Sequence, residues 1–174
     1  MADEKRVMTM LEIENMVIEW NDYVDTFGNE CAYTDDILRN IEKKIIQLNN
    51  PWTEKAERLA RDIYEWCKAN DFWGDNIIYF NGKAWMNNDT WGADKGKQIG
   101  EDLYEYKNKD PKDYFEYVRE PYNIFSMSFE GPLNHLLNGY IGHYSYEEKF
   151  EALFKKYGLY YEHGNTWNLS AYEL

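Results

Sequence analysis

Three side chains have the types needed for acid–base or metal chemistry if the fold brings them together. Glu130 stands beside Gly131 at the end of a predicted strand, His135 lies in the short helix predicted next, and His163 lies at a predicted turn. A carboxylate with imidazoles can transfer protons or hold a metal ion. The histidines show no HxH or HxxxH spacing, and Glu130 also occupies an expected helix cap. We therefore predict no enzyme, metal or cofactor, and keep a dispersed Glu130/His135/His163 site as the enzyme alternative.

Two further features invite a chemical interpretation. Cys67 falls on the apolar side of a predicted helix, which favours a core position over a nucleophile. Residues 87–100 contain three glycines with Lys95 and Lys97 and come closest to a phosphate-binding loop, but they lack the preceding strand and the Ser or Thr of that motif. We expect a loop whose local positive charge contacts nucleic acid or an acidic patch on a partner.

Acidic side chains dominate residues 7–38, which contain eight carboxylates and neither Lys nor Arg. A helix over residues 9–26 would place its apolar residues on one side and five acids on the other. Leu11 and Ile18 would lie within that acidic side and suggest a contact surface. The residues that we expect to bind a partner are Leu11, Glu12, Glu14, Ile18, Glu19, Asp22, Asp25, Glu30, Asp35 and Asp36.

A second acidic group is interleaved with tyrosines between residues 101 and 120. Carboxylates and phenol rings suit partners rich in Arg and Lys, through charge-assisted hydrogen bonds and cation–π contacts. The members of the group are Glu101, Asp102, Tyr104, Glu105, Tyr106, Asp110, Asp113, Tyr114, Glu116, Tyr117 and Glu120.

The overall composition restricts the class of partner. The 174-residue chain has a net charge of −13, so it would repel nucleic-acid phosphates and anionic membranes, which makes direct nucleic-acid binding an unfavoured reading. Basic nucleic-acid-binding proteins are the expected partners. There is no apolar N-terminal stretch or membrane span, and the two cysteines show no metal or redox spacing. We predict a cytoplasmic protein.

Periodicity and turn signals predict an α+β fold, with an N-terminal three-helix segment followed by a mostly antiparallel sheet with helices packed on it. The three helices are expected at residues 9–26, 34–48 and 53–70. Asn81-Gly82 predicts a hairpin between strands 77–80 and 83–86. Further strands are expected at 101–106, 124–129, 159–162 and 166–172, and further helices at 110–118, 133–137 and 145–157. We expect one domain, 1–174, with a possible subdivision into 1–72 and 73–174.

Three helices followed by a hairpin also match the element order of a winged helix-turn-helix. The recognition helix would be residues 53–70. A DNA-reading helix should carry a basic stripe, but the acids and bases of this helix nearly cancel. The pattern therefore disfavours DNA binding by this route.

Two stretches of the last third of the chain resemble segments of small proteins from phages and mobile elements of Gram-positive bacteria. One is Ser126-Met-Ser-Phe-Glu-Gly-Pro-Leu133 with Leu137-Asn-Gly-Tyr140. The other is Phe154-Lys-Lys-Tyr-Gly-Leu-Tyr-Tyr161 with Trp167-Asn-Leu-Ser-Ala-Tyr172. In size and acidity the chain is similar to small anti-CRISPR and antirestriction proteins, many of which imitate DNA.

This resemblance implies an inhibitor that acts in the cytoplasm of a bacterial host. Its target would be a nucleic-acid-targeting defence protein such as a CRISPR effector nuclease, bound by an acidic, DNA-mimicking surface that blocks nucleic-acid access. The alternative of the same binding class is an immunity protein or antitoxin that neutralises a basic toxin.

Overall fold

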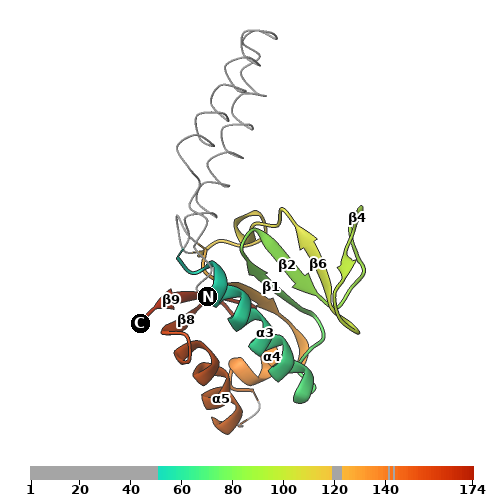
Figure 1. The fold of residues 1–174 in the computed structure, drawn as a ribbon. Helices are drawn as coiled ribbons and strands as arrows, with labels where there is room; N and C mark the ends of the chain where they lie inside the picture. The colour runs from blue at the N-terminus through green and yellow to red at the C-terminus, as the bar shows by residue number, and fades with distance from the viewer. Residues whose placement is uncertain (1–50, 119–122, 141, 143) are drawn as a thin grey trace, which may run out of the picture. The chain divides into compact units, whose positions relative to one another are not determined.

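The structure is a computed structural model that describes residues 51–118, 123–140, 142 and 144–174 (Figure 1). The chain divides into two units, Met1–Pro51 and Trp52–Leu174, and the helices and strands below belong to the second. The helices expected at 9–26 and 34–48 lie outside the described residues. No helix within the described residues is long and apolar enough to cross a membrane.

Helix α3, Thr53–Ala69, confirms the helix expected at residues 53–70. Apolar residues recur every three or four positions along it, which places them on one side of an α-helix. That side is buried and includes Leu59, Ile63 and Cys67, each 0% exposed. Cys67 is therefore a core residue as predicted, and burial raises the pKa of its thiol well above the ordinary value.

Seven strands form one sheet in the order β5-β6-β2-β1-β7-β9-β8, and every neighbouring pair is antiparallel. The predicted hairpin is confirmed, with Asn81 and Gly82 both at positive φ between β1 and β2. The strands are β1 (Asn76–Phe80), β2 (Lys83–Met86), β5 (Lys97–Gln98), β6 (Tyr104–Lys107), β7 (Ser126–Phe129), β8 (Leu159–Asn165) and β9 (Asn168–Glu173).

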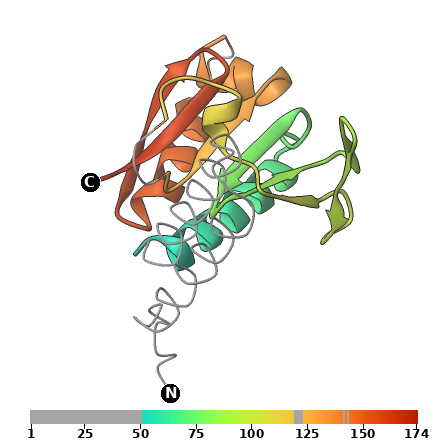
Figure 2. The same ribbon diagram turned by 90° about the horizontal axis from the view of Figure 1, so that it is seen from above.

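Residues 87–100 are more structured than the predicted loop. They contain a two-stranded ribbon, β3 (Thr90–Trp91) with β4 (Asp94–Lys95), and the edge strand β5 of the main sheet. The ribbon lies beside the β6 end of the sheet, far from α5 in both views (Figures 1 and 2). The Asn, Asp and Gly residues of this segment belong to short strands and tight turns. Composition alone does not distinguish such elements from a loop.

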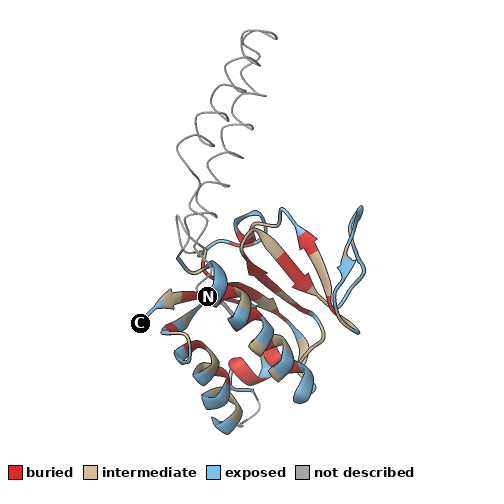
Figure 3. Cartoon of the chain, viewed as in Figure 1, coloured by how far each residue is buried: buried red, intermediate tan, exposed pale blue. Residues whose placement is uncertain are grey.

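One face of the sheet packs against helices. Side chains of β1, β2, β7 and β9 that share this face, such as Ile78, Trp85, Met127 and Leu169, form one core cluster with α3, α4 (Gly131–Leu137) and α5 (Tyr144–Lys155). The buried residues follow the strands and the inner sides of the helices, and exposed residues occupy the outer sides of α3 and α5 (Figure 3). Both α4 and α5 were expected, within one or two residues.

The predicted N-terminal three-helix segment before the sheet is wrong as a description of this structure. Within the described residues a single helix, α3, precedes the sheet. Its apolar side packs on β1 and α5 instead of a helical bundle. Periodicity identified that side but did not determine the element that covers it. The winged helix-turn-helix order depended on the same three-helix segment and is not supported.

The opposite face of the sheet is covered by an irregular segment. Successive strand residues alternate between the faces, so Tyr79, Ser126 and Ser170 project away from the helices. A 3-10 helix, η1 (Pro111–Asp113), follows Asp110, whose carboxylate accepts a hydrogen bond from the Lys112 amide. The helix expected over 110–118 therefore reduces to this one turn, and the residues after it lie across the sheet.

Candidate functional site

The best candidate site is the acid–tyrosine segment, which we define as Asp113, Tyr114, Glu116 and Tyr117. Phe115, in the middle of the segment, is 6% exposed and packs between Tyr79 and Trp167 at ring-centroid distances of 5.6 and 5.7 Å. The four neighbouring side chains are exposed. One buried ring thus anchors the segment, while the two carboxylates and the Tyr117 phenol are exposed and Tyr114 is partly covered.

Tyr117 is held in an unusual backbone conformation. Its φ is +51°, in the left-handed region that residues with a Cβ rarely adopt, and its side chain is 66% exposed. The Ser170 hydroxyl donates a hydrogen bond to the Tyr117 carbonyl at 3.3 Å. Strained residues that display their side chains are frequent at functional sites, where the surrounding structure maintains them. This strain is a second reason to regard the segment as functional.

Tyr114 lies within an aromatic cluster on the same face of the sheet. Its ring centroid is 4.8 Å from that of Trp91 and 5.8 Å from that of Tyr79. The Lys109 ammonium lies over Trp91, 4.4 Å from the ring centroid, and forms an ion pair with Asp94 at 2.8 Å. The hydrogen bond to Asp94 raises the pKa of Lys109, and burial opposes this only partly. The cluster connects the acid–tyrosine segment to the β3–β4 ribbon.

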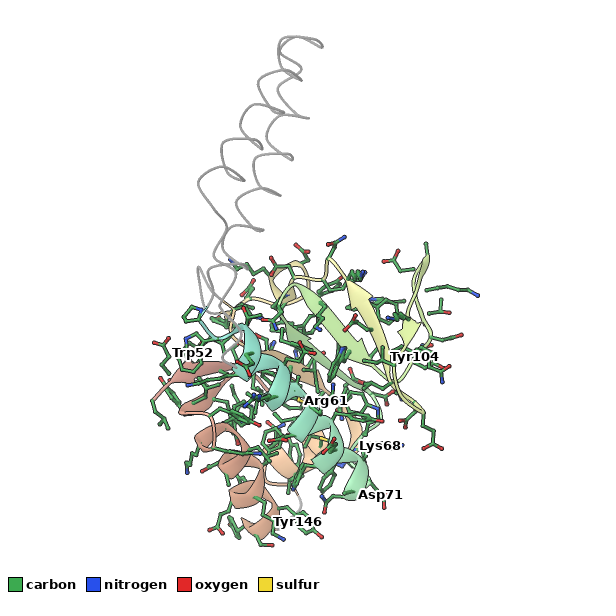
Figure 4. All side chains as sticks on the ribbon, in the orientation of Figure 1. Trp52, Arg61, Lys68, Asp71, Tyr104 and Tyr146 are labelled. Atoms are coloured by element: carbon green, nitrogen blue, oxygen red, sulfur yellow. The ribbon has the colours of Figure 1, made fainter. Side chains whose placement is uncertain are left out.

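The predicted second acidic group divides into structural and exposed members. Asp102 accepts hydrogen bonds from Tyr64 at 2.9 Å and from Lys68 at 2.5 Å. Lys68 lies near the C-terminal end of α3 (Figure 4). Glu105 accepts one from Trp85 at 3.1 Å and pairs with Lys83 at 3.1 Å. Burial raises the pKa of both carboxylates, but these donors outweigh it and lower both values. These two acids therefore stabilise the fold.

Of three other members of that group, two form structural hydrogen bonds and one lies outside the described residues. Asp110 caps η1, and the hydroxyl of the buried Tyr106 donates to the Asn88 carbonyl at 2.8 Å. Glu120 lies outside the described residues. Among the described members, the exposed acids and tyrosines of the group are thus mostly those of the acid–tyrosine segment.

The three residues of the enzyme alternative have separate neighbours. Glu130 is exposed and occupies the N-cap position of α4 without a side-chain capping bond. His135 contacts the ring of Tyr140, and His163 contacts those of Phe129 and Tyr161. Burial lowers the pKa of His163. Among the described residues, no group of three His, Cys, Asp or Glu side chains is arranged to hold a metal ion.

The two remaining predicted sites lie in other parts of the chain. The ten residues expected to bind a partner, between Leu11 and Asp36, lie outside the described residues. Lys95 and Lys97 line a hollow at the sheet edge together with Lys107 and Lys109, which the sequence analysis did not select. The Lys-x-Lys spacing of both pairs was the available signal, and only strand pairing shows that they converge.

No family model, curated protein or solved structure matches the chain.

Proposed function

We propose that this protein is a non-enzymatic inhibitor that binds a basic, nucleic-acid-handling protein, such as a CRISPR effector nuclease, and blocks its access to nucleic acid. The observation that supports this proposal best is the exposed acid–tyrosine segment anchored by Phe115. Its carboxylates suit Arg and Lys side chains that otherwise contact phosphates. Its tyrosines add large contact areas with few rotatable bonds.

Preorganisation supports the same function. A binding segment that is already ordered loses less conformational entropy when a partner binds. The Phe115 anchor and the Ser170 hydrogen bond hold the segment against the sheet before any partner arrives. The chain's net charge of −13 would speed encounter with a basic partner. The acids between residues 12 and 36 would add to this attraction.

Affinity capture with matched variants tests the proposal. The tagged full chain is incubated with a lysate of a low-GC Gram-positive bacterium in which a CRISPR effector has been induced. We expect the chain to retain one basic nucleic-acid enzyme, and the Asp113→Asn/Glu116→Gln variant to retain much less. The control, Glu65→Gln/Glu148→Gln, removes the same charge from exposed positions on α3 and α5.

The identity of the retained protein distinguishes the alternatives. Retention of a basic toxin would support an immunity protein or antitoxin instead of a defence inhibitor. Equal retention by both variants would contradict a role for the acid–tyrosine segment.

A further inference from the structure

A hollow of about 410 Å³ lies at the β5–β6 edge of the sheet. Small-molecule sites commonly measure about 300–1,000 Å³, so the hollow has the size of a ligand site. Among the described residues, its charged lining consists of four lysines, Lys95, Lys97, Lys107 and Lys109, and two carboxylates, Asp94 and Glu105. These six side chains together carry two net positive charges in a chain whose net charge is −13.

A glycine between two of the lysines allows the backbone beside the hollow to approach β6 closely. A Cβ on Gly96 would lie 2.8 Å from the Tyr104 Cβ and 2.8 Å from the Tyr106 ring, closer than real Cβ atoms approach. Without that atom, the backbone between β4 and β5 lies directly against β6. The Gly96 amide also donates to the Asp89 carbonyl at 2.9 Å. Lys95 and Lys97 are thus held on a fixed backbone.

Both carboxylates of the hollow already have cationic partners. Asp94 pairs with Lys109 at 2.8 Å, and Glu105 pairs with Lys83 at 3.1 Å. Among the described residues, Lys95, Lys97 and Lys107 form no direct ion pair, although Lys97 lies opposite Glu105 in the β5–β6 ladder and is attracted to it.

Strand register brings two of these three lysines onto one face. Lys97 lies opposite Glu105, and Lys107 lies two residues further along β6, which makes Lys97 and Lys107 diagonal neighbours. Lys107 also lies directly opposite Lys83, and like charges in this position destabilise a ladder. A bound anion would relieve this repulsion.

From this arrangement we infer that the hollow is a binding site for phosphate groups, contributed by a small polyphosphorylated molecule or by the terminus of a nucleic-acid strand. Lysine binds phosphate as a compact point charge. The described lining residues include no Arg, whose planar fork matches a carboxylate with two parallel hydrogen bonds. Salt screens exposed charges beyond roughly 8 Å at physiological ionic strength, so distant acids do not cancel the local field. The site is independent of the proposed inhibitor function.

Calorimetric titration of the full chain with inorganic tripolyphosphate tests this inference. We expect binding to one site, with affinity reduced about tenfold or more in a Lys95→Gln/Lys97→Gln/Lys107→Gln variant, because three charged contacts are lost. A matched variant, Lys55→Gln/Lys149→Gln/Lys155→Gln, removes the same charge from exposed positions on the two long helices and should bind as the wild type does. Circular dichroism checks that both variants are folded.

Further titrants identify the source of the phosphate. Single-stranded oligonucleotides with and without a terminal phosphate replace tripolyphosphate in parallel titrations. Lysine-dependent binding of the phosphorylated strand alone would support a strand terminus, and binding of tripolyphosphate alone would support a small molecule. Absence of saturable binding by every phosphate probe, equal losses in both variants, or equally tight binding of citrate would overturn the inference.

Discussion

Lys83 and Lys107 lie directly opposite each other in the β2–β6 ladder, yet within the described residues only Lys83 forms ion pairs with carboxylates. Lys83 pairs with Glu57 at 3.5 Å and with Glu105 at 3.1 Å. Lys107 has no ion-pair partner among the described residues. This asymmetry leaves one strand position that is electrostatically unfavourable for folding and available to an anion.

Reversing the charge of Lys107 should therefore stabilise the fold. Cross-strand pairs of opposite charge contribute about 0.2–1 kcal/mol, and like pairs cost energy. We expect Lys107→Glu to raise the free energy of unfolding by about 0.5 kcal/mol, measured by urea denaturation. The same variant should lose tripolyphosphate binding. A lower unfolding free energy in Lys107→Glu would show that the Lys83–Lys107 repulsion is not significant.

Strain at Tyr117 gives a second prediction. Asn tolerates the left-handed region better than Tyr does, and the region costs about 1–2 kcal/mol for ordinary residues. We expect Tyr117→Asn to leave the unfolding free energy unchanged or to raise it by about 1 kcal/mol, while retention of the partner falls. Tyr144→Asn, at a tyrosine that is 77% exposed, is the matched control and should retain the partner normally. If Tyr117→Asn retained the partner as well as the wild type does, Tyr117 would not be part of the interface.

Local signals explain which parts of the fold the sequence predicts. Asn81-Gly82 specifies its turn by the positive φ of two adjacent residues, so the hairpin needs no distant information. The buried side of α3 follows from helical spacing in the same way. Which element packs on that side of α3 depends on contacts between residues far apart in the sequence. The prediction of a three-helix segment failed because helical spacing does not show these contacts.

The candidate sites show the same division. Asp102 and Glu105 belong to an acidic stretch in the sequence, but pairing with Lys68 and Lys83 makes them structural. Lys97 and Lys107 are ten positions apart and become neighbours only through the β5–β6 register. The exposed tyrosines could be expected from composition, whereas the anchor at Phe115 depends on contacts with Tyr79 and Trp167.

Packing around Asn168 gives a third prediction. Asn168 is 0% exposed, and its amide oxygen and nitrogen have no hydrogen-bond partner in the described part of the structure. A Cβ added at Gly164 would collide with that oxygen. Gly164→Ala should therefore cost about 1–3 kcal/mol of unfolding free energy in the wild type.

A double-mutant cycle isolates this contact. In an Asn168→Ala background the cost of Gly164→Ala should fall by about 1 kcal/mol or more, because the colliding atom is absent. Chemical denaturation of the four proteins measures the difference. Additive effects of the two substitutions would contradict the predicted collision.

Acid sensitivity should depend in part on Glu105. Burial opposes its ionisation, but the Trp85 and Lys83 donors lower its pKa below the ordinary value of 4.5. A carboxylate with a lowered folded-state pKa contributes stability above its unfolded-state pKa, and this is lost as the pH falls through the folded-state value. We expect the unfolding free energy to decrease below about pH 4.5, and less steeply in Glu105→Gln. An identical pH dependence in wild type and variant would show that the ion pair contributes no such stability.

The proposed inhibitor would occupy the nucleic-acid-binding surface of a basic partner. The most direct test of this occupancy is the dissociation constant between the full chain and the purified captured partner, measured by biolayer interferometry at low and high salt, with and without the partner's guide or target nucleic acid. We expect weaker binding as salt rises and loss of binding when nucleic acid is bound first. A dissociation constant that is unaffected by both salt and nucleic acid would rule out this mode of inhibition.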